Sequence, residues 1–138
     1  MNESNKPQTP LLAVDGIIES EEGIILIERK NEPFGWAFPG GFVDRDKESA
    51  DEAIIREVEE ETNLQVTKSE QFKLYSNPNR DPRGHTATMV YIIEAKGELK
   101  AKDDAKNCII VSIKNINNYP IVFDHKQIIK DYIKYKLI

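Results

Sequence analysis

Four carboxylates lie within five consecutive positions near the middle of the chain, in the run Arg-Glu-Val-Glu-Glu-Glu at residues 56–61. In a helix, residues at positions i, i+3 and i+4 share one face, so we expect Glu57, Glu60 and Glu61 to lie together. A charged face of this kind is most often simply solvated. Three carboxylates on one face are, however, also the oxygen ligands that hard cations such as Mg²⁺ prefer.

The surroundings of this acidic face favour a functional site over a solvated surface. A loop that contains several glycines, residues 31–41, comes before the helix. An apolar stripe ends where the acidic face begins, so one side of the helix is expected to be buried and the other to face a cleft. Cations held there would offset the charge of a diphosphate and acidify a bound water, which a remaining carboxylate can orient or deprotonate. Arg56 can pin one of the carboxylates in a bidentate pair.

Two predicted helices must position these groups. Residues 49–62 are expected to form the first, in which Ser49 and Glu52 make a capping box. Asn63 ends it, because asparagine tolerates the left-handed backbone conformation. A last helix follows Pro120, with Asp124 as its cap and an apolar inner face. The residues expected on that face are Ile128, Ile129, Tyr132, Ile133 and Leu137.

Runs of apolar, often β-branched residues bounded by turn residues predict the strands. Trp36 and Phe38 are expected in a short strand within the glycine-containing loop. The longer predicted strands are 11–18, 23–28, 65–75, 86–94 and 108–113. Strands interleaved with two helices indicate an α/β fold, in which a mixed β-sheet is covered on both faces.

Length and composition limit the domain organisation and the partners. The chain has 138 residues, 39% of them apolar, which fits one domain: we expect residues 1–8 to form a flexible tail and residues 9–138 a single domain. The formal net charge of -5 disfavours nucleic acid as a partner. No segment reads as a signal peptide or a membrane span, and Cys108 has no second cysteine to pair with, so we expect a cytoplasmic protein that does not bind membranes.

The segment Pro39-Gly40-Gly41-Phe42-Val43, then Glu48, then residues 56–64 closely resembles the box motif of the Nudix family. The resemblance implies an α/β/α sandwich and the hydrolysis of a nucleoside diphosphate linked to another group. It implies Mg²⁺, with Mn²⁺ as an alternative, held by Glu57, Glu60, Glu61 and the carbonyl of Gly41. Glu60 or Glu57 is then the base, Arg56 orients a glutamate, and Glu48 supports the site. Many family members are dimers, so a homodimer is one of the expected states.

Two positions depart from this motif. The loop between Gly41 and Glu48 holds one residue more than the box, and Asn63 stands where the box has glycine. A loop insertion is usually tolerated, and asparagine can replace a helix-ending glycine. The insertion puts the role of Glu48 in doubt, whereas the Arg-Glu and Glu-Glu core is intact.

Segments 9–15, 80–86 and 123–125 are similar to those of the compact ADP-ribose pyrophosphatases in that family. For such a substrate, Arg80 and Arg83 offer guanidinium forks to phosphate or ribose oxygens, and Arg29 is a further candidate. His85 either contacts substrate or only holds its loop. Trp36 either stacks on the base or belongs to the core. Asp104, in a late loop, is a candidate for an extra carboxylate near the metals.

Two other functions are alternatives to ADP-ribose hydrolysis. One is a house-cleaning hydrolase of nucleoside triphosphates or dinucleotides, which the box alone allows equally well. The other is a non-catalytic sensor of ADP-ribose. Such regulators usually carry a DNA-binding domain and often lose box carboxylates, whereas this chain has no basic stripe and keeps Glu57, Glu60 and Glu61, so we expect an enzyme.

Overall fold

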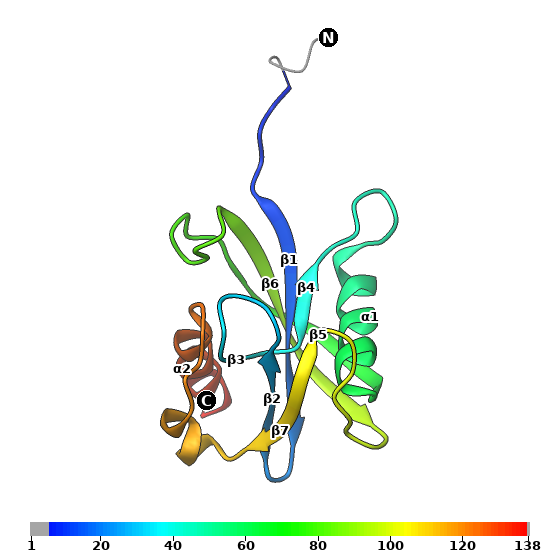
Figure 1. Cartoon of the computed structure of the whole chain (residues 1–138), viewed down its shortest axis with the longest axis vertical. Helices are drawn as coiled ribbons and strands as arrows, with labels where there is room; N and C mark the ends of the chain where they lie inside the picture. Colours follow the sequence, from blue (N-terminus) through cyan, green and yellow to red (C-terminus); the bar gives the residue numbers. More distant parts are fainter. Residues whose placement is uncertain (1–5, 138) are drawn as a thin grey trace.

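The computed structural model describes residues 6–137 and contains one mixed sheet between two helices (Figure 1). The sheet has seven strands in the order β3-β2-β1-β6-β5, with β4 paired to β1 and β7 paired to β2. The strands are β1 (Leu11–Ser20), β2 (Gly23–Arg29), β3 (Trp36–Ala37), β4 (Gly40–Phe42), β5 (Gln65–Tyr75), β6 (Thr86–Lys96) and β7 (Ala105–Val111). The predicted tail falls largely on residues 1–5, outside the described residues, while residues 6–10 are exposed and belong to no helix or strand.

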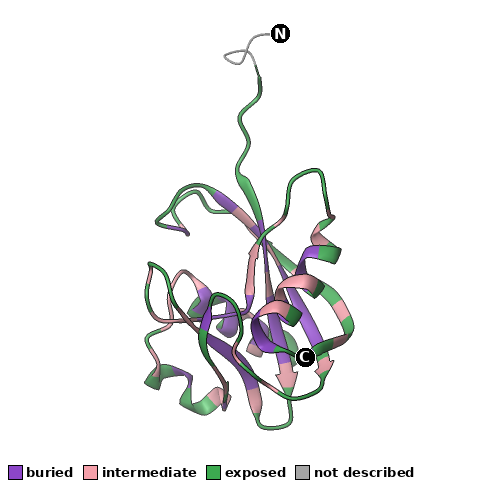
Figure 2. Cartoon of the chain, turned by 45° about the vertical axis from the view of Figure 1, so that its right-hand side comes forward, coloured by how far each residue is buried: buried purple, intermediate pink, exposed green. Residues whose placement is uncertain are grey.

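Strand β1 organises the sheet, because it pairs with three other strands. It runs parallel to β6 and antiparallel to β2 and β4. Its successive side chains point to opposite faces of the sheet, as in any strand. Val14 and Ile18 lie in the core beneath helix α1 (Ala50–Thr62), and Ile17 lies in the core beneath helix α2 (His125–Lys136). Figure 2 shows these buried strands between the two helices. The predicted α/β class with a mixed sheet is confirmed.

Helix α1 begins and ends as the sequence predicts. The Ser49 side chain accepts a hydrogen bond from the backbone N–H of Glu52, and the Glu52 side chain accepts one from the N–H of Ser49. Asn63 follows the helix in the left-handed conformation, with φ of 67°. These two ends hold the acidic face of α1 at a defined rotation against the sheet.

Helix α2 differs from the prediction at both ends. The Asp124 side chain does not cap the helix, because both of its oxygens accept hydrogen bonds from Arg80 instead. Leu137 was predicted to face inward but is 81% exposed, because it lies beyond the last turn of the helix. A long-range ion pair between Arg80 and Asp124 thus takes the place of the predicted helix cap.

Strands β7 and β4 also differ from the prediction. β7 begins at Ala105 and ends at Val111, because Ile113 starts a short 3-10 helix. β4 was predicted as loop because it contains Gly40 and Gly41. The glycine at position 40 is required by packing, since a Cβ there would lie 2.1 Å from the carbonyl oxygen of Val14. The close approach of β4 to β1 brings the glycine loop under α1.

Candidate active site

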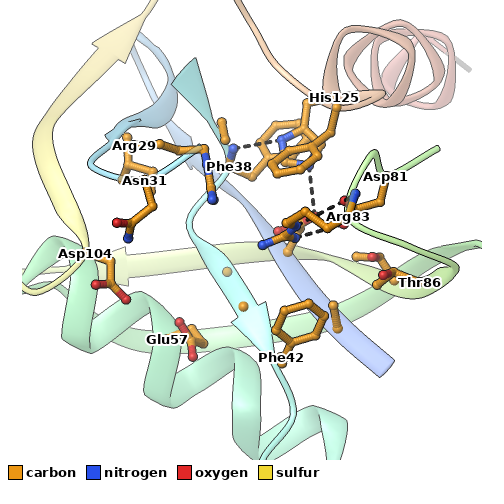
Figure 3. Close-up of a pocket in the computed structure, with 18 of the residues that line it drawn as sticks. Arg29, Asn31, Phe38, Phe42, Glu57, Asp81, Arg83, Thr86, Asp104 and His125 are labelled. Carbon is orange, nitrogen blue, oxygen red and sulfur yellow. Dashed lines mark hydrogen bonds and ion pairs between the residues drawn. The ribbon is translucent and has the colours of Figure 1, made fainter. Parts of the chain in front are cut away.

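A cavity of about 400 Å³ lies between α1, β4 and the loops that follow β2 and β5 (Figure 3). Six carboxylates and four cationic side chains are among its lining residues. The carboxylates are Asp15, Glu32, Glu57, Glu61, Asp81 and Asp104, and the cations are Arg29, Lys30, Arg80 and Arg83. This size suits a nucleotide-sized ligand. The excess of carboxylates means that an anionic ligand needs added cations to bind.

One side of the cavity is formed by Glu57, Glu61 and Asp104, which we call the acidic wall. Glu61 is only 5% exposed and accepts a hydrogen bond from the backbone N–H of Gly40 at 2.9 Å. Burial raises the pKa of Glu61 well above its usual range, and the nearby Glu57 carboxylate raises it further. A buried carboxylate in this state gains strongly from a cation beside it.

The Glu57 carboxyl group lies directly against the backbone of Gly41. Burial is the main cause of the raised pKa of Glu57, opposed by its hydrogen bond from Arg56. A Cβ at Gly41 would lie 2.8 Å from all three atoms of the Glu57 carboxyl group. Glycine at position 41 therefore lets the backbone of the loop run directly against this carboxylate.

Arg56 joins three glutamates of the motif, Glu48, Glu57 and Glu60, to each other. It donates from Nε and Nη2 to the two oxygens of Glu48, at 2.8 and 2.7 Å, and from Nη1 to Glu57 and Glu60, at 2.7 and 3.1 Å. The Arg56 hydrogen bonds and the backbone N–H of Asp44 lower the pKa of Glu48 to about 2. Glu48 is thus paired with Arg56 despite the extra residue in the loop. This is a supporting position, as the motif resemblance implies.

Glu60 lies beside the cavity and not among its lining residues. Its side chain is 44% exposed and borders a shallower hollow on the outer side of α1. Within residues 6–137, no group of three or more His, Cys, Asp or Glu side chains is arranged so that it could hold a metal ion by itself. Oxygen donors on an open surface fit Mg²⁺, which is usually held by one or two carboxylates together with waters and substrate phosphates.

The opposite side of the cavity is formed by Arg29, Arg83, Phe42 and Phe123, which we call the cationic wall. The four side chains stack alternately: the Arg83 guanidinium lies 5.1 Å from the Phe42 ring and 5.0 Å from the Phe123 ring, and Arg29 lies 5.1 Å from the Phe123 ring. Phe123 has φ of 57°, a left-handed conformation that is costly for a bulky residue. Tertiary contacts therefore hold this ring in place between two arginines.

Each arginine of the cationic wall keeps one terminal nitrogen free. Arg83 donates from Nε and Nη2 to Asp81, and Arg29 donates from Nε and Nη2 to the carbonyls of Pro33 and Glu32. Neither Nη1 atom has a partner within residues 6–137. Figure 3 shows both side chains at the cavity, across from Glu57 and Asp104. These N–H groups can bind phosphate or sugar oxygens.

The other three predicted substrate residues lie differently. Arg80 lines the cavity, but its side chain is 5% exposed and bonds to Asp124 and Thr88. Trp36 is not a lining residue and packs edge-on against Tyr119. His85 is not a lining residue either, and its ring bonds to the carbonyl of Ser76. Of the alternatives left open by the sequence, the geometry of Trp36 and His85 matches the structural ones.

Four further residues of the cavity have no functional signal in the sequence: Asp15, Phe42, Asp81 and Phe123. All four belong to segments quoted for the family resemblance, but an isolated aspartate or phenylalanine has no spacing that indicates a function. His125, on the same cavity, stacks on Phe38 and bonds to Asp15. Only the tertiary fold brings these residues to the carboxylates of α1.

An acidic helix that faces arginines across a cavity can bind an anionic phosphate compound through divalent cations. The model of the NUDIX domain matches residues 9–132, and the chain belongs to the Nudix family. The family predicted from the motif is thereby confirmed. Within residues 6–137, no helix is both long enough and apolar enough to cross a bilayer.

Similar proteins include an ADP-ribose pyrophosphatase of Methanocaldococcus jannaschii, 48% identical over 131 residues, which are 92% of this chain and 75% of that protein. A bifunctional NMN adenylyltransferase/ADP ribose pyrophosphatase from Francisella tularensis, complexed with AMP and Mn ion, has a TM-score of 0.80 and 30% identity over 96% of this chain and 43% of its own. The NUDIX domain of Shewanella oneidensis NrtR, complexed with ADP ribose, has a TM-score of 0.84 and 25% identity over the whole of both chains.

Proposed function

We propose that this protein hydrolyses ADP-ribose to AMP and ribose 5-phosphate with the help of Mg²⁺. The observation that carries the proposal is the opposition of two walls across one cavity, with Glu57 and Glu61 on one side and the free nitrogens of Arg29 and Arg83 on the other. A diphosphate placed between them meets cation-binding oxygens and N–H donors at once. The 48% identity to an ADP-ribose pyrophosphatase supports the same substrate.

The residues present fit a divalent cation, because every donor is a hard oxygen and carboxylates outnumber cationic groups in the cavity. Glu57, Glu60, Glu61 and the carbonyl of Gly41 would hold Mg²⁺, with Mn²⁺ as the alternative. Bound there, the cation supplies charge neutralisation at the diphosphate and a more acidic water. Either Glu57 or Glu60 would take the proton of the attacking water.

The remaining charged residues position these groups. Arg56 holds Glu57 and Glu60 at fixed distances, and Glu48 holds Arg56 from the other side. Arg29 and Arg83 bind the substrate directly, whereas Arg80 fixes Asp124 and the start of α2. The homodimer and the cytoplasmic location stay predictions.

Product analysis by chromatography tests the proposal. The purified protein is incubated with Mg²⁺, Mn²⁺ or a chelator and a panel of ADP-ribose, NADH, a diadenosine polyphosphate and nucleoside triphosphates. We expect AMP and ribose 5-phosphate, formed fastest from ADP-ribose and only with a divalent cation. Faster turnover of a triphosphate or a dinucleotide would replace the substrate and keep the chemistry. Tight binding of ADP-ribose without turnover of any compound would indicate the sensor function instead.

A further inference from the structure

Asp15 lines the cavity, but it belongs neither to the proposed metal ligands nor to the hydrogen-bonded partners of the arginines. It lies on β1, directly opposite Gly40 of β4, and its side chain is largely buried. Asp15 lines the same cavity as Glu61 and Arg83, and its Oδ1 atom lies beside Gly40, whose backbone N–H binds Glu61. The Asp15 carboxylate is therefore near the acidic wall and the cationic wall at once.

His125 holds one oxygen of Asp15 in a fixed position. The Nδ1 atom of the buried His125 ring accepts a hydrogen bond from the backbone N–H of Phe38 at 3.1 Å. The ring proton must then be on Nε2, which lies 3.0 Å from Oδ2 of Asp15 and donates to it. The other oxygen, Oδ1, has no partner within residues 6–137. Because Asp15 lines the cavity, this oxygen is a preoriented acceptor there, beside the backbone of Gly40.

The charges around Asp15 indicate what kind of group this acceptor meets. Arg83 is already neutralised by Asp81 through two hydrogen bonds, and the nearby Arg29 has no carboxylate partner within residues 6–137. The negative charge of Asp15 beside these arginines reduces the positive charge that would attract a terminal phosphate. The cavity therefore offers the free N–H groups of Arg29 and Arg83 together with one acceptor, Oδ1 of Asp15. The N–H groups suit a phosphate, and the acceptor suits hydroxyl groups beside it.

We propose that Asp15, held by His125, accepts hydrogen bonds from the hydroxyl groups of a ribose beside the diphosphate. The carboxylate then selects a diphosphate that carries a sugar over a chain that ends in phosphate, because hydroxyls donate to it and a phosphate is repelled. This inference rests on the proposed function for its substrate, but it concerns binding and can be tested without turnover.

The test is isothermal titration calorimetry of the wild-type protein and the Asp15→Asn variant with Mg²⁺ present. The ligands are AMP, dAMP, ribose 5-phosphate and inorganic phosphate. Asparagine keeps the shape of the side chain and loses the charged acceptor, so we expect a dissociation constant about 10-fold to 100-fold higher for the sugar phosphate whose hydroxyls Asp15 binds. A weaker complex with AMP but not with dAMP assigns the adenosine ribose, and a weaker complex with ribose 5-phosphate assigns the terminal one. Phosphate should bind equally well or better.

Two further variants keep the result interpretable. Asp15→Ser should give the same pattern if the asparagine variant is unstable in a thermal melt. Asp131→Asn, which removes a carboxylate bonded to Tyr75 outside the cavity, should change no dissociation constant. Equal weakening of all four ligands, or of none, would overturn the inference and leave Asp15 as a metal-site or packing residue. If ADP-ribose is not hydrolysed but the sugar phosphates respond as expected, the proposed function fails and this inference stands.

Discussion

The two walls of the cavity are built in opposite ways. The acidic wall takes Glu57 and Glu61 from neighbouring turns of one helix and only Asp104 from a loop, so most of its geometry follows from helical spacing. The cationic wall takes its residues from four places: the end of β2, the loop after β5, strand β4 and the segment before α2. A functional surface made by one element can be read from sequence, whereas one made by several elements depends on the fold.

The walls also differ in how their charges are balanced. Arg83 and Arg29 already have partners within the protein, through Asp81 and through backbone carbonyls. Glu61 is buried with one N–H donor and with other carboxylates nearby, which is why its pKa is raised. The acidic wall is thus adapted to a ligand that brings positive charge, and the cationic wall is preorganised without one. We therefore expect changes in the acidic wall to act on kcat and changes in the cationic wall to act on KM.

The largest effect should follow from Glu61→Gln or Glu60→Gln. Each change keeps the size of the side chain and removes a charge that a divalent cation needs. We expect kcat for ADP-ribose to fall by about 100-fold to 1,000-fold at saturating Mg²⁺, with little change in fold. Steady-state kinetics with circular dichroism spectra measures both.

Glu59→Gln is the matched control for these two variants. It lies on the same helix, accepts only a long hydrogen bond from the N–H of Val66, and does not line the main cavity, so its kcat should stay near that of wild type. Activity close to wild type in both the Glu60 and the Glu61 variants would defeat the metal assignment. A loss in the Glu61 variant alone would make Glu60 a supporting residue, as its exposed position beside the cavity allows.

Much of the fold was predictable because its signals are local. The capping box of Ser49 and Glu52, the left-handed Asn63 and the bounds of β5 all agree with the prediction. The short β4 was missed because its glycines read as loop, and their reason is the close approach to β1. The cap of α2 was wrong because Arg80, 44 residues away in sequence, takes the Asp124 side chain.

The site likewise contains residues that a local motif predicts and residues that only the fold places. Glu48, Arg56 and Glu57 belong to one motif, and the structure brings them together through hydrogen bonds. Among the five predicted substrate residues, spacing could not separate an arginine that faces the cavity from one that braces a loop. Arg80 and Arg83 are three positions apart, yet only Arg83 keeps a free Nη1 atom at the cavity. That difference arises from contacts with Asp124 and Thr88, which no local pattern reveals.

Arg83→Lys tests whether the cationic wall acts on binding. Lysine keeps the charge but loses the two parallel bonds to Asp81 and the stacking between Phe42 and Phe123. We expect KM for ADP-ribose to rise about 30-fold, with a much smaller change in kcat. Arg45→Lys, in an exposed loop away from the cavity, is the control and should leave both constants unchanged. A large loss in kcat at unchanged KM would show that the two walls do not divide binding and chemistry in this way.

The charge imbalance of the acidic wall should also be visible in stability. Because burial and Glu57 raise the pKa of Glu61, the folded protein keeps a proton there at pH values where the unfolded chain, with a pKa near 4.5, has lost it. The free energy of unfolding therefore falls as pH rises above about 4.5 towards the raised folded value. Glutamine cannot ionise, so Glu61→Gln should stabilise the protein by about 1 to 2 kcal/mol at about pH 8 in a chelator. Urea unfolding at acidic and alkaline pH measures this, and an identical pH dependence in both proteins would contradict it.

The smallest effect is expected for Phe123→Leu, which removes the ring between Arg29 and Arg83 but leaves both arginines in place. Each cation–π contact at such a site contributes about 0.5 to 1 kcal/mol, so KM for ADP-ribose should rise only about 2-fold to 5-fold. Phe34→Leu, an exposed phenylalanine that does not line the cavity, is the control for general effects of losing a ring. Unchanged KM would mean that the hydrogen bonds to Asp81 and to the carbonyls of Glu32 and Pro33 suffice to orient the arginines. A fall in kcat instead would mean that Phe123 also sets the position of the diphosphate relative to the acidic wall, so the two walls act as one unit in catalysis.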